Sequence, residues 1–135
     1  MINPENELCG VILCGGKSKR MGFPKHKLLL PNGLTYIDSI YMELKKICKN
    51  IVVSGDVSLP GTKTIKDIKK NHGPIGGIYS VLESGISSYY FFVSCDTPFF
   101  KHKTSHPLLK SFKKKPSSGF HFYKDEKTEQ NHFFP

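Results

Sequence analysis

The sequence predicts an α/β fold with a mainly parallel sheet, because three successive segments have the patterns of a strand, a helix and a second strand. Residues 11–14 form a continuous apolar run that is short enough for one buried strand. Residues 35–48 carry apolar side chains at helical spacing. Residues 51–54 are rich in β-branched side chains. A strand, a helix and a strand in this order form a βαβ unit, in which the two strands are parallel.

The predicted helix over 35–48 has signals at both of its ends. Thr35 and Asp38 have the spacing of a capping box, which satisfies the first free N–H groups of a helix. Lysines gather toward the end of the segment, where positive charge suits the helix dipole. The apolar face of this helix consists of Ile37, Ile40, Tyr41, Leu44, Ile47 and Cys48.

Later segments extend the same architecture. Residues 64–68 predict a short third strand, and 89–93 are apolar on both faces, as a central parallel strand should be. A glycine-rich turn at 72–77 opens an apolar stretch that ends around Gly85; taken alone, it also fits a helix start with proline in the first turn. Residues 108–112 have near-helical spacing, and 119–123 predict another strand.

Composition limits the classes of protein to which this chain can belong. A length of 135 residues with 38% apolar content predicts one globular domain over 1–135. The net charge of +9 suits an anionic partner such as a nucleotide, a phosphorylated cofactor, nucleic acid or an acidic protein. No segment approaches the length of a membrane span, so we expect a soluble, cytoplasmic protein with no membrane partner.

The cysteines and histidines predict no metal centre. Cys9, Cys14, Cys48 and Cys95 form no CxxC pair, which favours buried free thiols in a reducing compartment. His102 and His106 have no third ligand nearby in the sequence, so we expect them to be surface residues. The pattern of the lysine triplet 113–115 favours a solvated helix end, with a nucleic-acid patch as the alternative.

The segment after the first strand has the composition of a polyphosphate site. Gly15 and Gly16 allow a sharp turn that presents several backbone N–H groups to one anion. The cations Lys17, Lys19, Arg20 and Lys25 follow directly. A strand that leads into a glycine turn with basic residues just after it predicts phosphate binding, although an ordinary turn in a solvated loop is the alternative.

A second candidate group follows the strand at 89–93. Asp96 comes directly after this strand, and the carboxyl ends of parallel strands are where open α/β sheets bind ligands. Pro98 directs the chain out of the strand. A turn aspartate is the alternative interpretation of this position.

Three motifs together resemble one family. Residues 13–25 are similar to the LxGGxSxRMGxxK signature of the nucleotidyltransferase superfamily that includes the MobA-like molybdenum cofactor guanylyltransferases. Cys14 stands where alanine is usual. The segment GPIGG at 73–77 resembles the family's GPLxG, and CDTP at 95–98 resembles its CDxP motif. The pattern is filled by Leu13, Gly15, Gly16, Ser18, Arg20, Met21, Gly22 and Lys25.

The resemblance implies a fold and a reaction. The fold is a Rossmann-like three-layer α/β/α arrangement of the nucleotide-diphospho-sugar transferase type. The reaction is transfer of GMP from GTP to molybdopterin, or Mo-molybdopterin, with release of pyrophosphate, in molybdopterin guanine dinucleotide biosynthesis. The resemblance also implies Mg²⁺ as cofactor, and contacts with other proteins of molybdenum cofactor biosynthesis or with target enzymes. We expect no nucleic-acid partner, because the aromatic cluster at 89–93 lies away from the lysine triplet at 113–115 in the sequence.

The same resemblance assigns roles to individual residues. Arg20, Lys25 and Asp96 would be catalytic, and Asp96 would also bind the metal, while Lys27 competes with Lys25 for the position of the motif lysine. Ser54 falls where some relatives have asparagine, so its part in selecting guanine stays open. The nucleotide-binding set implied is Leu13, Cys14, Gly15, Gly16, Lys17, Ser18, Lys25, Ser54, Asp67 and Asp96.

Two alternatives accompany this interpretation. One is a related enzyme of the same fold that transfers a cytidylyl group or acts on a sugar phosphate. The other is a non-catalytic nucleotide-binding fragment, because the chain matches only the first part of the family fold and ends on apolar residues. We therefore expect 1–135 to be an incomplete nucleotidyltransferase domain from which the last third of the family fold is absent.

Overall fold

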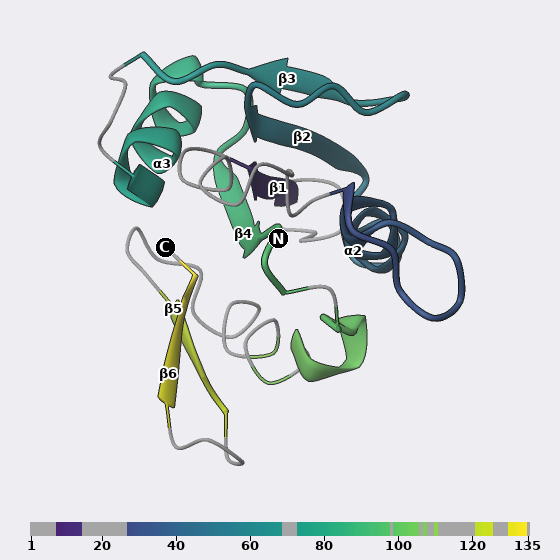
Figure 1. Cartoon of the computed structure of the whole chain (residues 1–135). Helices are drawn as coiled ribbons and strands as arrows, with labels where there is room; N and C mark the ends of the chain where they lie inside the picture. Colours follow the sequence, from purple (N-terminus) through teal and green to yellow (C-terminus); the bar gives the residue numbers. More distant parts are fainter. Residues whose placement is uncertain are drawn as a thin grey trace.

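Four parallel strands form the centre of the molecule, in the order β3-β2-β1-β4 (Figure 1). The computed structural model describes residues 8–14, 27–68, 73–97, 99–105, 107, 110, 121–125 and 130–134. Its elements are β1 (Leu8–Cys14), α2 (Tyr36–Leu44), β2 (Asn50–Gly55), β3 (Lys63–Ile65), α3 (Gly73–Ser84), β4 (Tyr89–Ser94), the 3₁₀ helix η3 (His102–Ser105), β5 (His121–Asp125) and β6 (Gln130–Phe134).

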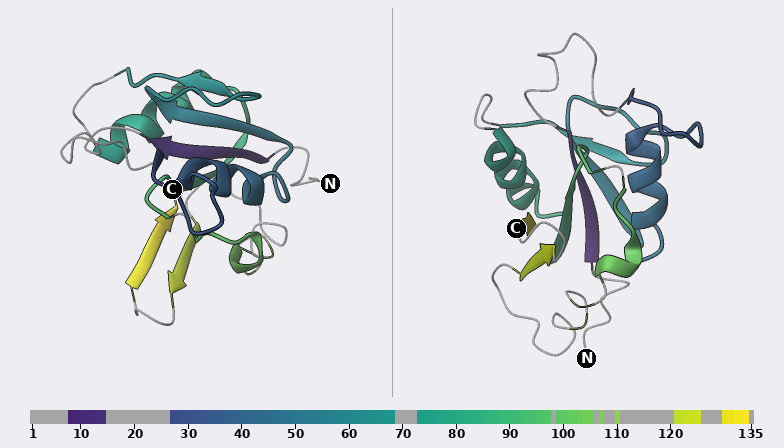
Figure 2. Two further views of the ribbon diagram at one scale, coloured as in Figure 1. Left: turned by 45° about the vertical axis from the view of Figure 1, so that its right-hand side comes forward. Right: turned by 60° about the horizontal axis from the view of Figure 1, so that its bottom comes forward.

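The two helices α2 and α3 cover opposite faces of this sheet, as the right-hand view of Figure 2 shows. Successive side chains of a strand point to opposite faces, so each strand contributes to two separate cores. Ile12 and Val53 belong to the core beneath α2, whereas Val11 and Val52 belong to the core beneath α3. The predicted three-layer α/β/α fold is confirmed.

The start of α2 is the predicted one, but its end is not. The Thr35 hydroxyl accepts the backbone N–H of Asp38 at 3.1 Å and donates to the Asp38 carboxylate at 2.7 Å. The helix ends at Leu44, before the predicted end at residue 48. Beyond it the chain tightens into turns, in which the N–H groups of Ile47 and Cys48 both donate to the Leu44 carbonyl. Both side chains still reach the core, which explains why the apolar spacing continued past the helix.

The strands agree with the sequence pattern in type and differ in extent and position. β2 contains the predicted run 51–54, while β3 spans only Lys63–Ile65, so that Asp67 lies in the segment beyond it. β4 pairs with β1 alone in the four-stranded sheet and therefore lies at its edge, not at its centre. The predicted strand at 119–123 corresponds to β5, which pairs with β6 in an antiparallel hairpin. The expectation for residues 108–112 lies largely outside the described residues.

Two expectations about side chains have opposite outcomes. All four cysteines are buried and free, as predicted. His102 was expected at the surface, but it is half-buried and contacts Glu43. Its backbone N–H donates to Glu43 Oε1 at 2.9 Å, and its Nδ1 lies 2.9 Å from the same carboxylate oxygen. In the described residues no helix is long and apolar enough to cross a membrane.

The carboxylate of Glu43 connects α2 to η3 through its hydrogen bonds with His102. Burial alone would raise the pKa of this carboxyl, but hydrogen bonds from His102 and Lys46 lower it to about 2. A carboxyl with a lowered pKa stabilises the folded state above its ordinary pKa of 4.5, and this stabilisation is lost as the pH falls toward 2.

We therefore predict that Glu43→Gln lowers the free energy of unfolding at pH 7 by about 2 kcal/mol, because charge-assisted bonds to a buried carboxylate are lost. Urea unfolding of both proteins between pH 7 and pH 2 measures this effect. The difference between them should shrink below pH 4.5. Glu83→Gln, at an exposed position on α3, is the matched control. A difference that stays constant down to pH 2 would contradict the prediction.

Candidate functional site

The carboxyl ends of β1, β2 and β4 lie side by side because the register of the parallel strands aligns them. We call this end of the sheet, where the strands stop, the carboxyl edge. Leu13 is the partner of Ser54 on β2 and of Ser94 on β4. The Cys95 N–H donates to the Leu13 carbonyl at 3.0 Å, which extends the contact one residue beyond β4. This edge is also where the chain leaves β1 at Cys14 and enters the glycine-rich segment. Ligands of open α/β sheets bind at such an edge.

Two buried polar atoms at this edge have no hydrogen-bond partner within the described part of the chain. They are Oγ of Ser54, at the end of β2, and Oδ1 of Asp67, two residues after β3. Ser54 is only 1% exposed. Buried polar groups in folded proteins are nearly always paired, because an unpaired group loses its bonds to water and gains nothing in return. These two atoms are therefore candidate contacts for a ligand.

Both atoms lie against the same glycine of α3. A Cβ on Gly77 would lie 2.7 Å from Ser54 Oγ and 3.6 Å from Asp67 Oδ1. It would also lie 3.4 Å from Cδ2 of Leu13. The absence of a side chain at Gly77 thus lets the helix backbone come close to three residues at the carboxyl edge of the sheet.

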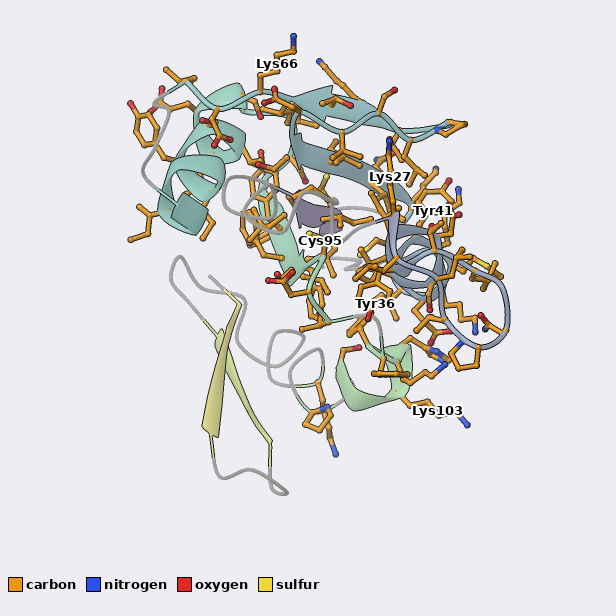
Figure 3. All side chains as sticks on the ribbon, in the orientation of Figure 1. Lys27, Tyr36, Tyr41, Lys66, Cys95 and Lys103 are labelled. Atoms are coloured by element: carbon orange, nitrogen blue, oxygen red, sulfur yellow. The ribbon has the colours of Figure 1, made fainter. Side chains whose placement is uncertain are left out.

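The electrostatics of Asp67 follow from this position. Burial raises the pKa of the Asp67 carboxyl, and the negative charge of Asp56 raises it further. The neighbouring side chain of Lys66 is exposed and points away from the sheet (Figure 3). A carboxylate that is partly desolvated binds an N–H group more strongly than a carboxylate in water does.

Asp96 lies at the same edge, in a turn that begins at the end of β4. The Asp96 N–H donates to Ser94 Oγ at 3.2 Å, and the Thr97 N–H donates to the Ser94 carbonyl at 3.1 Å. These bonds turn the chain away from the strand and leave the Asp96 side chain exposed. An exposed carboxylate at this point can contact a ligand or a cation.

Cys14 and Cys95 occupy the face of the sheet beneath α2 (Figure 3 labels Cys95). A hydrogen bond with Cys95, burial, and the charges of Cys95 and Asp96 all raise the pKa of the Cys14 thiol. A thiol with a raised pKa is a poor metal ligand, and both side chains are buried, so Cys14 and Cys95 act here as core residues.

The structure describes five of the predicted site residues. Leu13, Ser54 and Asp67 lie together around Gly77, while Cys14 and Asp96 lie at the ends of β1 and β4. Cys14 faces the α2 core, so only its backbone is available at the edge. The predictions for Gly15, Gly16, Lys17, Ser18, Arg20 and Lys25 lie outside the described residues, and that for Lys27 is not tested.

Sequence reasoning missed two residues of this region as site residues. Gly77 appeared only as part of the GPIGG segment, although its missing side chain determines how closely α3 approaches. Ser80 is a buried hydroxyl within the apolar stretch 78–82 of α3. A lone polar residue on the buried face of an apolar helix is the signal that could have identified it.

A parallel sheet with unpaired polar groups and an exposed carboxylate at its carboxyl edge defines a ligand-binding α/β domain. More narrowly, this chain belongs to the MobA-like NTP transferase domain family, whose family profile matches residues 10–135.

Curated relatives agree with this assignment, and a solved structure shares the fold. The chain is 32% identical over 96 residues to the molybdenum cofactor guanylyltransferase of Desulfosudis oleivorans, covering 68% of this chain and 48% of the relative. It is 40% identical over 98 residues to that of Campylobacter jejuni subsp. doylei, covering 69% and 50%. The chain thus spans about half the length of these relatives. The fold is similar to that of 2-C-methyl-D-erythritol 4-phosphate cytidylyltransferase from Francisella tularensis, with a TM-score of 0.61 at 14% identity, covering 96% of this chain and 66% of that one.

Asp67→Asn should raise stability at neutral pH. The pKa of Asp67 is raised in the folded state, so at pH values between 3.8 and this raised pKa the folded state binds more protons than the unfolded state. The free energy of unfolding therefore falls as the pH rises from 3.8 through the raised pKa. Thermal unfolding should show a higher midpoint for the variant at pH 7 and converging midpoints below pH 3.8.

Asp56→Asn provides the control for this measurement, because it removes only the neighbouring charge and should give a smaller gain. An Asp67→Asn protein that is less stable than the wild type at pH 7 would show that the carboxylate has a stabilising partner.

Gly77→Ala should destabilise the fold by about 1–2 kcal/mol, because the new Cβ would overpack the buried contact with Ser54. Combining it with Ser54→Ala removes the atom that it meets. In that background alanine should be neutral or should stabilise α3 by roughly 0.5–1 kcal/mol, since glycine is a poor helix former. Chemical denaturation of the four proteins of this double-mutant cycle measures the coupling, and additive effects would refute the contact.

Proposed function

We propose that this chain carries out guanylyl transfer: it binds GTP at the carboxyl edge of the sheet and transfers GMP to molybdopterin, with release of pyrophosphate. The observation that carries the proposal is the pair of buried atoms Ser54 Oγ and Asp67 Oδ1, which have no hydrogen-bond partner among the described residues and lie on the same edge as Asp96. Relatives named molybdenum cofactor guanylyltransferase, at 32% and 40% identity, support the choice of nucleotide and acceptor.

Guanine fits the two atoms chemically. Its Watson–Crick edge carries an N–H and an amino group, and a carboxylate only accepts hydrogen bonds. Asp67 can therefore bind these two donors, and the Ser54 hydroxyl can either donate or accept beside it. Cytosine lacks the ring N–H of guanine, so this set of acceptors favours guanine.

A magnesium ion fits the donor set at this edge. Mg²⁺ prefers hard oxygen ligands and is commonly held by one or two carboxylates together with substrate phosphates and water. The exposed Asp96 supplies one such carboxylate, while no group of three or more His, Cys, Asp or Glu among the described residues could hold a metal by itself. When bound, the ion would neutralise charge on the phosphates.

In the proposed reaction, a phosphate oxygen of molybdopterin attacks the α-phosphorus of GTP. A new P–O bond forms, the bond to the bridging oxygen breaks, and pyrophosphate leaves with the electron pair. The attacking phosphate is already ionised, so the protein needs to supply position and positive charge and no strong base. We assign the binding of the phosphates to the backbone of residues 15–18 and to the side chains of Arg20 and Lys25, because these residues belong to the sequence motif at 13–25. The soluble cytoplasm is the compartment in which we place this reaction.

Pyrophosphate release tests the proposal directly. The purified chain is supplied with Mg²⁺, molybdopterin and one of GTP, CTP, UTP or ATP. Release with GTP alone supports guanylyl transfer, and release with CTP supports the cytidylyl alternative. Calorimetric binding of GTP without any turnover supports a non-catalytic nucleotide-binding protein.

Asp96→Asn should reduce Mg²⁺-dependent transfer by about 10²-fold or more, because an amide oxygen is a much weaker ligand for a hard cation. The fold should be unaffected, because the Asp96 side chain is exposed and the turn is held by the backbone N–H. Glu83→Gln, at another exposed acid, should keep full activity. Near wild-type transfer by Asp96→Asn would remove Asp96 from the metal site.

A further inference from the structure

Asp67 lies on a segment that the sheet does not hold. β3 ends at Ile65, so the backbone of residues 66–68 makes no ladder bonds with the strands that the structure describes. The buried carboxylate oxygen of Asp67 also has no hydrogen-bond partner among the described residues. A side chain that recognises a ligand must nevertheless be held within a fraction of an ångström, so another group must hold this segment in place.

Ser80 of α3 supplies that group. Its side chain is 1% exposed, and its Oγ lies 2.8 Å from the backbone nitrogen of Ile68, the residue directly after Asp67. The same Oγ lies 2.8 Å from the carbonyl oxygen of Gly76, one helical turn earlier. A backbone N–H can only donate and a carbonyl can only accept, so the hydroxyl must accept from Ile68 and donate to Gly76. Both bonds of the hydroxyl are therefore fixed in direction.

The small residues of α3 make this contact possible. Gly77 leaves room for Asp67 Oδ1, which would lie 3.6 Å from a Cβ at that position. Gly76, Gly77 and Ser80 fall within little more than one helical turn, so one short stretch of α3 contacts both the carboxylate and the backbone that carries it.

We propose that Ser80 is a positioning residue, which holds the Asp67 carboxylate in place to recognise the base of the nucleotide. The proposal rests on the proposed function, because Asp67 must contact the base for its position to matter. A serine that bonds only to the carbonyl four residues earlier would be an ordinary feature of a helix, but the second bond, to a different segment, is specific to this site.

The test compares Ser80→Ala with Ser84→Ala. Ser84 lies one turn further along α3, and in the described part of the chain its hydroxyl bonds only to the Val81 carbonyl of its own helix, so it is a matched control. Calorimetry with Mg²⁺ measures the affinities for GTP and for ITP, which lacks the exocyclic amino group. We expect Ser80→Ala to weaken GTP binding about tenfold and ITP binding much less, so that the preference for GTP is lost. Ser84→Ala should preserve that preference.

Equal losses for the two nucleotides, or an unchanged preference in Ser80→Ala, would overturn the positioning role, because a merely structural serine affects both ligands alike. A separate measurement without nucleotide follows the titration of the Asp67 carboxyl carbon by NMR. If Ser80 holds this group, its raised pKa should move back toward 3.8 in Ser80→Ala. An unchanged titration would overturn the proposal.

The two proposals fail in different ways. Wild-type protein that binds no GTP, or Asp67→Asn protein that keeps its preference for GTP over ITP, refutes the base-recognition role of Asp67. The NMR titration still decides whether Ser80 positions the carboxylate.

Discussion

The parallel register of β1 with β2 and β4 is the constraint on which the site depends. It places Leu13 beside both Ser54 and Ser94, and so brings three distant parts of the sequence to one edge. Because parallel strands need crossover connections, the helices α2 and α3 cover the two faces of the sheet (Figure 2), and ligands of such sheets bind at the carboxyl ends of the strands. The site is thus a consequence of the topology and needs no special local structure in the strands themselves.

The helix α3 completes the site by approaching closely and supplying few side-chain atoms. Gly77 leaves space next to Ser54, and Ser80 bonds to the segment that carries Asp67. Within the part of the chain that the structure describes, this arrangement leaves two buried polar atoms without hydrogen-bond partners, which reduces stability. The raised pKa of Asp67 reflects the same desolvation. A site prepared for a ligand accepts such a penalty in the absence of that ligand.

Local sequence patterns predicted the elements well where the physical signal is local. The capping residues Thr35 and Asp38 defined the start of α2, and β-branched residues defined β2. The end of α2 was missed because Ile47 and Cys48 remain buried after the helix has stopped, so periodicity alone could not distinguish them from helical residues. The pairing of His102 with Glu43 was missed because 59 residues separate them.

The sequence by itself determined the βαβ order, the buried cysteines and, through three motifs, the MobA-like family. Only the tertiary structure decided that β4 is the outermost strand of the four-stranded sheet and that Ser54 and Asp67 both lie against Gly77. It also decided that the Ser80 hydroxyl accepts a hydrogen bond from the backbone N–H of Ile68, next to Asp67. The reason is physical: hydrophobic spacing and turn chemistry act over a few residues, whereas strand order and helix approach depend on contacts between segments that the linear pattern does not encode.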